Sequence, residues 1–451
     1  MRTPILIFPV LFIALTHVAL ADEGVKIRMQ GSSFAPNQAK SPLSSVQEVP
    51  VTFDIVLDQQ GQYRSVSSSH YPGDIEFRYL SIGTKAGLVV ADLLGWRTGK
   101  ELARLDAKAA QNNYADLLFS VPHLLMKNAR DRLAMSTPIE LQAQYQYESF
   151  IDAAGRPATI VVDKQSGDVV SARSATKTYE YSDYVNHQGQ RQAQKVTEKR
   201  GQTVVAMWSH VQSEKIDHLD EHAFILPYGY QEKQDKGVLR AIVIAPDTYR
   251  VEGSASGYHT HFSVGSHSVA VYDAPVSPVE GALVKALIEK TAPNKKIAYL
   301  ILTHTHGDHI NGAPAYFNKE LQIFTGKDGK QALNRQFGAE HDVNIQEVGT
   351  RKDLDLGGRS IQIYPAPNSH ASEMLFSYDA MTKTLFQGDL FALPEVGPVP
   401  VGFTVNQELN QLIQDYGLKV ERITSVHGRV GTLAELQQTV ALKNTETASA
   451  K

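Results

Sequence analysis

Apolar and polar residues alternate with a period of two through most of the first half of the chain. The stretch VTFDIVLD at 51–58 shows this pattern, and ATIVVDKQSGDVVSAR at 158–173 predicts a hairpin that turns at Ser166 and Gly167. Between these stretches, from 85 to 132, Leu and Ala recur at helical spacing and predict one or two helices packed on the sheet. Residues 22–237 are therefore predicted to form a β-rich α+β domain.

The pattern changes after the polar segment QEKQDKG at 231–237, which we interpret as a linker. The stretch 259–275 predicts two strands, SPVEGALVKALIEKTAP a helix, and KIAYLILTH at 296–304 a strand buried on both faces. Strand, helix and buried strand make a βαβ unit, and ligands of such folds gather at the carboxyl ends of strands. Residues 238–451 are predicted to be a second domain. Its later elements are the strands SIQIYPAP, MLFSYD, TKTLFQGDL and RITSVHG and a helix near 405–418.

The first 21 residues, MRTPILIFPVLFIALTHVALA, run from Arg2 through an apolar stretch to Ala19-Leu20-Ala21. This is the pattern of a cleavable signal peptide, so we expect cleavage after Ala21 and a periplasmic or secreted protein. The apolar run is shorter than the roughly 20 residues of a spanning helix, so no stable membrane insertion is expected after cleavage.

Composition narrows the partners and the chemistry. The 451 residues carry a formal net charge of −4, which disfavours nucleic acid as a partner and leaves a small-molecule substrate as the expectation. There is no cysteine, which excludes disulfides, thiolate nucleophiles and thiolate metal ligands. The oligomeric state is not indicated by any pattern in the sequence.

The densest chemistry lies in THTHGDHING at 303–312, directly after the predicted buried strand. Imidazole and carboxylate groups are ligands for zinc, manganese or iron, and a metal needs several of them converging from rigid supports. Three later segments, each predicted to end a strand, supply further ligands of the same kinds: IQIYPAPNSH with His370, TLFQGD with Asp389 and ITSVHG with His427. The spacing therefore predicts a metal site built from distant strands.

These motifs resemble the metallo-β-lactamase-fold superfamily, whose signature is H-x-H-x-D-H followed by His, Asp and His at later strand ends. The resemblance covers about residues 238–451 and implies a C-terminal αββα sandwich. It also implies that His304, His306 and His370 hold one metal, that Asp308, His309 and His427 hold a second, and that Asp389 bridges the two. VAVYDAP resembles the first motif of the family, in which an aspartate, here Asp273, hydrogen-bonds the ligand loop.

The resemblance implies a hydrolase with two divalent cations, with zinc expected and iron or manganese as alternatives. A metal-bridging hydroxide would attack an ester, lactone, thioester, amide or phosphodiester bond, and Asp308 would carry a proton. Gly-Asp at 388–389 resembles the glyoxalase II and lactonase branches rather than the β-lactamases that use cysteine.

Two other functions remain open at this point. One is a mono-iron oxygenase of the same fold, similar to persulfide dioxygenases. The other is a periplasmic binding or carrier protein with a vestigial metal site. Residues 22–237 contain no chemical motif of their own, so they are candidates for covering the active site, for binding a lipid or polymer, or for dimerisation. HLDEH at 218–222 fits an inverted zinc-peptidase pattern but has no identifiable third ligand, so we interpret it as a polar turn.

Overall fold

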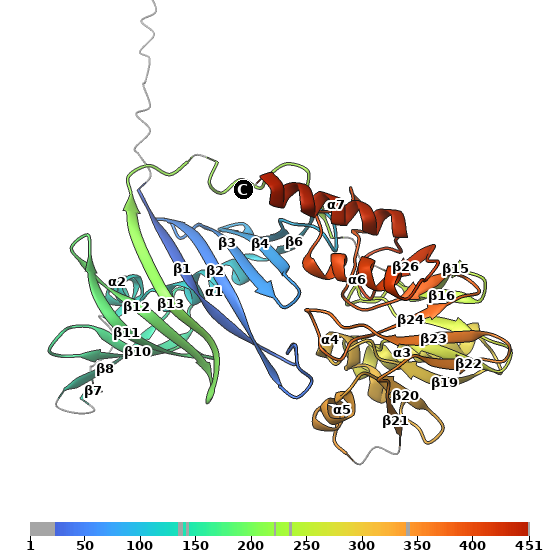
Figure 1. The fold of residues 1–451 in the computed structure, drawn as a ribbon. Helices are drawn as coiled ribbons and strands as arrows, with labels where there is room; N and C mark the ends of the chain where they lie inside the picture. The colour runs from blue at the N-terminus through green and yellow to red at the C-terminus, as the bar shows by residue number, and fades with distance from the viewer. Residues whose placement is uncertain are drawn as a thin grey trace, which may run out of the picture.

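In the computed structural model, residues 23–133, 139–140, 144–220, 222–233, 237–339 and 343–449 are described. The predicted signal peptide, residues 1–21, lies outside them. Two bodies follow each other along the chain, a large N-terminal sheet and a C-terminal sandwich (Figure 1). No helix in the described ranges has the length and apolar character required to cross a membrane.

The N-terminal body is one 14-stranded sheet, in the order β14-β6-β5-β4-β3-β2-β1-β13-β12-β11-β10-β9-β8-β7. Each strand pairs mainly with its neighbour in sequence, and β1 joins the early strands to the late ones by pairing with β13. The elements are β1 (Gly24–Pro36), β2 (Val46–Asp58), β3 (Tyr63–Tyr71), β4 (Ile75–Thr84), β5 (Gly87–Asp92), β6 (Glu101–Leu105), α1 (Ala107–Phe119), α2 (Pro122–Leu133), β7 (Ile139–Glu140), β8 (Tyr145–Ile151), β9 (Pro157–Asp163), β10 (Val169–Arg173), β11 (Thr178–His187), β12 (Gln190–Arg200), β13 (Thr203–Ile216) and β14 (Gln231–Glu232).

The helices α1 and α2 cover one face of this sheet. Helix α1 begins where the Asp106 carboxylate accepts a hydrogen bond from the backbone N–H of Ala109 at 2.8 Å, a side-chain N-cap. The fully buried Phe119 and Leu125 pack into the same apolar cluster as Ile27 and Ile55 of the central strands. Helices were expected from residue 85 onward, but the first part of that stretch forms β5 and β6, joined by a loop at 93–100. The short apolar run from Leu88 fits either structure by pattern, and pairing with β4 makes it a strand.

The C-terminal body is a sandwich of a 7-stranded and a 5-stranded sheet. The first sheet contains β15 (Arg240–Ala245), β16 (Thr248–Glu252), β17 (His261–Val264), β18 (Ser268–Tyr272), β19 (Lys296–Ile301), β20 (Gln322–Thr325) and β21 (Asn344–Glu347). The second contains β22 (Lys352–Asp355), β23 (Ser360–Pro365), β24 (Leu375–Asp379), β25 (Thr384–Phe386) and β26 (Arg422–Thr424). The helices are α3 (Pro278–Thr291), α4 (Gly307–Ile310), the 3-10 helix η1 (Ala313–Tyr316), α5 (Gly329–Phe337), α6 (Thr404–Asp415) and α7 (Leu433–Ser449).

Apolar clusters place the four layers of this sandwich. Between the sheets, Tyr272 of β18 stacks on Phe386 of β25 with ring centroids 3.7 Å apart, inside a fully buried cluster. Helix α3 packs on the outer face of the first sheet through Val284 and Ile288, and α6 packs on the outer face of the second through residues such as Leu409. The αββα arrangement implied by the resemblance is therefore confirmed, with an α+β body ahead of it.

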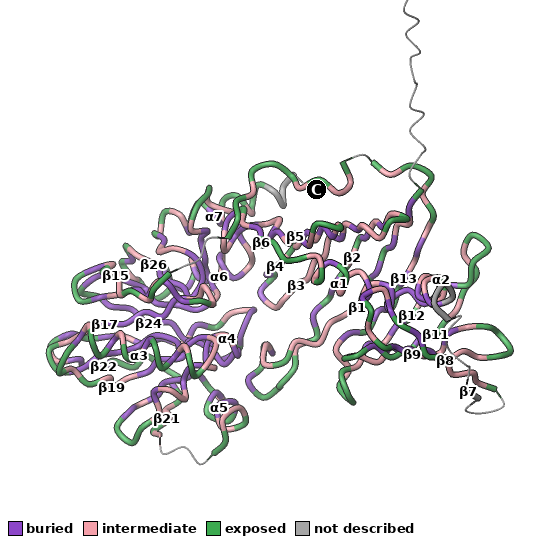
Figure 2. The backbone as a smooth tube through the Cα atoms, turned by 180° about the vertical axis from the view of Figure 1, so that it is seen from behind, coloured by how far each residue is buried: buried purple, intermediate pink, exposed green. Residues whose placement is uncertain are grey.

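The two bodies bury their strands differently (Figure 2). All five residues of β18 and of β24 are buried, as expected for strands covered on both sides. By contrast, β2 alternates buried and exposed positions along most of its length. The strand β19 was expected to be buried on both faces, but only its last two residues are; the first four are exposed or half-buried.

Candidate metal centre

The seven candidate ligands stand at the ends of strands on one edge of the sandwich. His304 and His306 lie in the loop after β19, and Asp308 and His309 lie in α4, which that loop enters. The other three, His370, Asp389 and His427, follow β23, β25 and β26. Because β19 runs parallel to β18 and β25 runs parallel to β26, their carboxyl ends meet at the same edge.

The structure brings all seven side chains together in two groups that share Asp389. In each group the possible ligand atoms lie within 4.8 Å of one another. The first group is His304, His306, His370 and Asp389, and the second is Asp308, His309, Asp389 and His427.

Asp389 presents one carboxylate oxygen to each group. Its Oδ2 lies 3.4 Å from Nε2 of His370 and 3.9 Å from Nε2 of His304. Its Oδ1 lies 3.1 Å from Nε2 of His309 and 3.2 Å from Nε2 of His427. A carboxylate in this position can bind two cations at once.

Asp273 orients the ligand loop from beneath. Its Oδ1 accepts a hydrogen bond from the backbone N–H of Thr303 at 2.7 Å, and its Oδ2 accepts from the Thr303 hydroxyl at 2.8 Å and from Nδ1 of His309 at 3.0 Å. The Thr303 oxygen lies 3.1 Å from Nδ1 of His304. These contacts place a proton on Nδ1 of both His304 and His309, so that Nε2 is the ring atom that faces the site.

The N-terminal body orients two further imidazoles. Nε2 of His306 donates to the carbonyl oxygen of Ala39 at 3.1 Å, and Nδ1 of His370 donates to the carbonyl oxygen of Pro72 at 3.0 Å. A carbonyl only accepts, so each contact fixes which ring nitrogen is left for a metal. The segment after β1 and the turn after β3 are therefore part of the metal centre.

A third contact from the same segment reaches the aspartate of the ligand loop. The side-chain amide of Gln38 donates to Oδ1 of Asp308 at 2.8 Å, and the backbone N–H of Gly307 donates to the carbonyl oxygen of Asn37 at 2.9 Å. Together these bonds hold the start of α4 against the N-terminal body.

Two glycines permit the close packing around the ligands. A Cβ on Gly388 would lie 2.5 Å from the Thr303 hydroxyl, which explains glycine directly before Asp389. Gly73 has a φ of +89°, and a Cβ there would lie 2.5 Å from Val405 and 3.1 Å from the Cβ of His370. The turn after β3 can approach His370 only because this position has no side chain.

The electrostatics of the site keep His304, His306 and Asp389 in their metal-binding protonation states and concentrate positive charge on His309, beside the two carboxylates. Burial lowers the pKa of His304 well below its usual range and that of His306 to about 3, so both rings are neutral. Burial would raise the pKa of Asp389, but His309 and His427 outweigh burial and hold that pKa well below its usual range. Burial would likewise lower the pKa of His309, but the carboxylates of Asp389 and Asp308 raise it well above its usual range.

Buried atoms without partners show that these residues fit a metal pair. Within the described part of the chain, Nε2 of His309, Nε2 of His370 and Oδ1 of Asp389 are buried and form no hydrogen bond. Unpaired buried polar atoms are costly, and all three point into the cluster. Two divalent cations would satisfy them, in a ligand set of nitrogen and oxygen that suits zinc, iron or manganese.

A pocket of about 290 Å³ opens over the metal centre. One side consists of ligands, among them Asp308, Asp389 and His427, with Tyr258 packed against the His427 ring at 4.7 Å between centroids. The opposite side comes from the N-terminal body and is largely aromatic. Its residues include Gln38, Tyr71, Phe77, Tyr79, Trp96 and Arg97.

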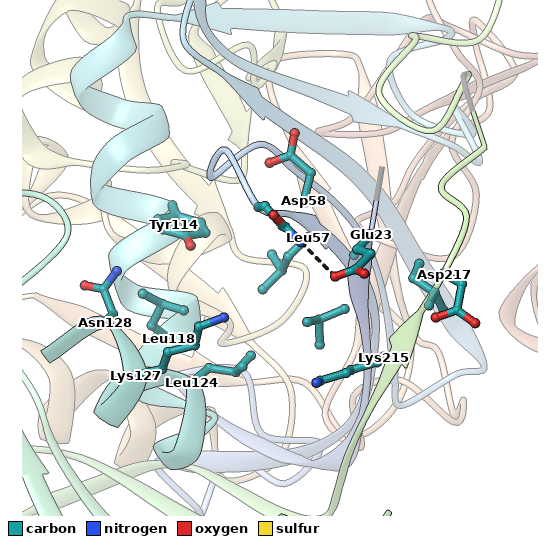
Figure 3. Close-up of a pocket in the computed structure, with 14 residues that line it drawn as sticks. Glu23, Leu57, Asp58, Tyr114, Leu118, Leu124, Lys127, Asn128, Lys215 and Asp217 are labelled. Atoms are coloured by element: carbon teal, nitrogen blue, oxygen red, sulfur yellow. Dashed lines mark hydrogen bonds between the residues drawn. The ribbon is translucent and has the colours of Figure 1, made fainter. Parts of the chain in front are cut away.

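A larger hollow lies away from this chemistry. About 530 Å³ in volume, it lies between α1 and the ends of β1, β2 and β13, and Figure 3 shows Tyr114, Leu118 and Lys215 along it. It shares no residue with the metal pocket and contains no histidine. Its size alone therefore does not indicate an active site.

Several residues around the metal centre were missed by sequence reasoning. Gln38, Tyr258, Trp96 and Arg97 belong to no motif, and the carbonyl contribution of Ala39 could come from any residue type. In the HLDEH stretch, Glu221 lies outside the described residues, while His218 and His222 are exposed in a loop and turn. They are not part of either ligand group.

Comparisons with known proteins agree with the fold. Residues 266–416 match the model of the ODP family beta lactamase. The chain is 26% identical over 145 residues to the rubredoxin-oxygen oxidoreductase of Megalodesulfovibrio gigas, covering 32% of this chain and 35% of that protein. It is 23% identical over 148 residues to a coenzyme oxidase of Methanocaldococcus jannaschii, and this match covers 32% of this chain and 35% of that protein. The chain thus spans about a third of the length of these relatives.

Solved structures of a metallo-β-lactamase and of a rubredoxin oxygen:oxidoreductase also align with part of the chain. The metallo-β-lactamase from Pontibacter korlensis aligns with a TM-score of 0.38 and 17% identity, covering 46% of this chain and 99% of that one. The rubredoxin oxygen:oxidoreductase from Desulfovibrio gigas aligns with a TM-score of 0.40 and 20% identity, covering 47% and 62%. The curated relatives are named as an oxidoreductase and an oxidase, so the expectation of an enzyme of this fold is supported while the expectation of hydrolysis is not.

Proposed function

The C-terminal half of this chain belongs to the metallo-β-lactamase-fold superfamily, and we propose that the protein is a binuclear metal-dependent hydrolase of a small organic substrate. The observation that carries this proposal is the position of Asp389, whose two oxygens face two separate groups of ligands. When bound, a pair of divalent cations would supply an activated water and would polarise the bond to be cleaved.

The residues of the chain have separate parts in this proposal. The imidazoles of His304, His306 and His370 would hold one cation, and those of His309 and His427 would hold the other. Hydrogen bonds orient four of these rings, those of His304, His306, His309 and His370. Asp308 lines the pocket, and its Oδ1 is already engaged by Gln38. Its Oδ2 lies 3.9 Å from Nε2 of both His309 and His427, where it would bind the second cation and accept a proton from the attacking water.

The size and lining of the pocket favour an organic substrate. A volume of about 290 Å³ is close to the lower end of ordinary ligand pockets and far exceeds what a diatomic gas needs. Its aromatic wall would exclude water from the scissile bond and hold an apolar group. Hydrolysis also needs no second cofactor, because water is the only co-substrate.

A second candidate is an oxidoreductase, and the names of the relatives favour it. The rubredoxin-oxygen oxidoreductase and the coenzyme oxidase each match about a third of the chain, and another relative is named a flavoprotein. In this case the centre would hold iron, one or two ions, and an electron donor such as a flavin would be required. A mono-iron oxygenase similar to persulfide dioxygenases is the form of this candidate that acts on an organic substrate.

The third alternative, a periplasmic binding or carrier protein with a vestigial metal site, is disfavoured because the two ligand groups are complete.

Elemental analysis of the purified full-length protein tests the choice, combined with two assays. A hydrolase would contain about two zinc ions per chain and cleave a member of a panel of lactones, esters, thioesters, phosphodiesters and β-lactams. An oxidoreductase would contain iron and consume dioxygen when given a reduced flavin, or when given glutathione persulfide. Iron with dioxygen consumption and no hydrolysis would overturn the hydrolase.

We also propose export, from the pattern of residues 1–21. Peptide mass analysis of the secreted or periplasmic fraction should find a mature N-terminus at Asp22. A protein that keeps Met1 and stays in the cytoplasm would contradict this proposal.

A further inference from the structure

Arg97 is a cation in the wall of the metal pocket, in the loop between β5 and β6. Its guanidinium carbon lies 5.2 Å from the centre of the Phe77 ring and 5.9 Å from that of Trp96. Its Nη2 donates to the phenolic oxygen of Tyr79 at 3.3 Å. Aromatic faces and one hydroxyl thus hold the planar group in place while using few of its five N–H donors.

Arg97 is half-buried, and its pairing differs from that of two buried arginines, Arg250 and Arg359. Arg250 forms an ion pair with Glu395, and Arg359 forms one with Asp379. In the described ranges, no carboxylate oxygen lies within 4.0 Å of the Arg97 guanidinium. Burial raises the pKa of Asp92 and the nearby Arg97 opposes that rise, but the Asp92 carboxylate accepts its hydrogen bonds from the backbone of Leu94 and Gly95 and forms no direct ion pair with Arg97. A half-buried guanidinium without a direct ion pair is ready to bind an anion from outside the protein.

The loop that carries Arg97 is fixed against the metal centre. A Cβ on Gly428, the residue after the ligand His427, would lie 3.2 Å from the Arg97 carbonyl oxygen. Within the loop, the backbone N–H of Gly99 donates to the carbonyl oxygen of Gly95 at 2.9 Å. The backbone at Arg97 therefore lies directly against the segment that carries the ligand His427.

The net charge that the pocket would have with two cations bound also favours binding of an anion. Of the candidate ligands only Asp308 and Asp389 carry negative charge, so a pair of divalent cations would leave the pocket net positive, and Arg97 adds to it. We propose that the substrate is an organic oxyanion, a carboxylate, sulfate or phosphate, whose charged group is bound by Arg97 and whose apolar part packs on Phe77 and Trp96. This inference rests on the proposed function, because it takes the metal pocket as the substrate site.

The chain offers a direct optical probe of this binding, because it has only two tryptophans and one of them is Trp96. In full-length, metal-loaded Trp208→Phe protein, the remaining tryptophan emission reports the pocket. Phenylacetate should change that emission with a dissociation constant at least about ten-fold lower than that of the neutral phenylacetamide, the scale of one charge-assisted hydrogen bond. Phenyl phosphate and phenyl sulfate, titrated in the same way, identify the preferred oxyanion.

Variants assign this preference to Arg97. Arg97→Gln should weaken phenylacetate binding by about ten-fold or more and leave phenylacetamide binding unchanged, while Arg97→Lys, which keeps the charge, should recover part of the loss. Arg78→Gln is the matched control, because Arg78 lies on the same strand as Tyr79 and pairs with Glu76 at 2.7 Å. It should have no effect on either ligand.

Two results would overturn the inference. One is equal binding of phenylacetate and phenylacetamide by the unmodified pocket, and the other is full retention of phenylacetate binding in Arg97→Gln, which would mean that the cations alone hold the anion. Circular dichroism of each variant checks the fold, and Arg97→Lys still tests the role if Arg97→Gln misfolds. Anion binding that depends on Arg97 without any hydrolysis would reject the hydrolase only. Hydrolysis without dependence on Arg97 would reject this inference only.

Discussion

The N-terminal sheet and the C-terminal sandwich contribute to the same pocket in opposite ways. The sandwich supplies all seven candidate ligands, as side chains at the ends of buried strands. Among its described residues the N-terminal body supplies no ligand, but its backbone carbonyls at Ala39 and Pro72 orient two of the ligand imidazoles, and its aromatic residues form the facing wall. The metal centre therefore depends on residues outside the fold that carries its ligands.

The largest effect is expected at the shared ligand. Asp389→Asn removes a charge that faces both groups, so turnover should fall by about a thousand-fold or more and metal content should fall below two ions per chain. Activity assays and elemental analysis measure both quantities. The control is Asp353→Asn, on the surface of the same sandwich, where Asp353 pairs only with Arg351. Near-normal activity of Asp389→Asn with full metal content would refute the bridging position.

The stability of the N-terminal body should depend on pH through His123 of helix α2. Burial lowers the pKa of His123 to about 4 from the ordinary 6.5, so the unfolded chain takes up the proton first as pH falls. The contribution of His123 to the free energy of unfolding should therefore be fully present above pH 7. It should decline by about 3 kcal/mol between pH 6.5 and 4. Denaturant unfolding of wild type and His123→Gln at pH 7.5 and 4.5 measures this. The decline should be smaller in the variant, and equal declines would contradict the prediction.

The contact between the sheet and the metal centre can be disturbed at Gly73. In Gly73→Ala the new Cβ meets Val405 and His370, which pushes the Pro72 carbonyl away from the His370 ring. Metal affinity should fall by about ten- to a hundred-fold, the range for losing a group that orients a ligand. Competition with a chromophoric chelator measures it. Gly167→Ala is the matched control, because Gly167 also has a positive φ of +73° but nothing lies within 4 Å of its added Cβ. An equal loss of metal affinity in both variants would mean that backbone strain, and not the contact, is responsible.

The smallest effect is expected at Gln38. Gln38→Ala removes the hydrogen bond to Oδ1 of Asp308, so turnover should fall by about ten-fold while the free energy of unfolding changes by less than about 0.5 kcal/mol. Steady-state kinetics and thermal unfolding separate the two quantities. Gln411→Ala in α6 serves as the control, since the exposed Gln411 amide likewise donates to a carboxylate, that of Asp415, at 2.8 Å. Unchanged kinetics in Gln38→Ala would show that the sheet does not act through Asp308.

The two bodies also differ in how far their sequence predicts them. The ligand motifs can be recognised because specific side chains recur directly after apolar strands, and the αββα layers were implied by the family that these motifs resemble. The carbonyls of Ala39 and Pro72 leave no such signal, since every residue has a carbonyl. The position of Arg97 and Trp96 in the pocket could not be predicted for another reason. They lie in a stretch whose Leu and Ala spacing predicts a helix, but pairing with neighbouring strands turns that stretch into two strands joined by a loop.

The hydrogen bonds from His306 to Ala39 and from His370 to Pro72 link metal loading to the joint between the two bodies. A cation that fixes these rings also fixes the carbonyls that hold them, and a firmly seated sheet in turn preserves the ring orientation that a cation requires. By thermodynamic reciprocity, each process must favour the other by the same free energy. The metal-loaded protein should therefore resist cleavage by proteases between β14 and β15 better than the chelator-treated one, a property that belongs to neither body alone.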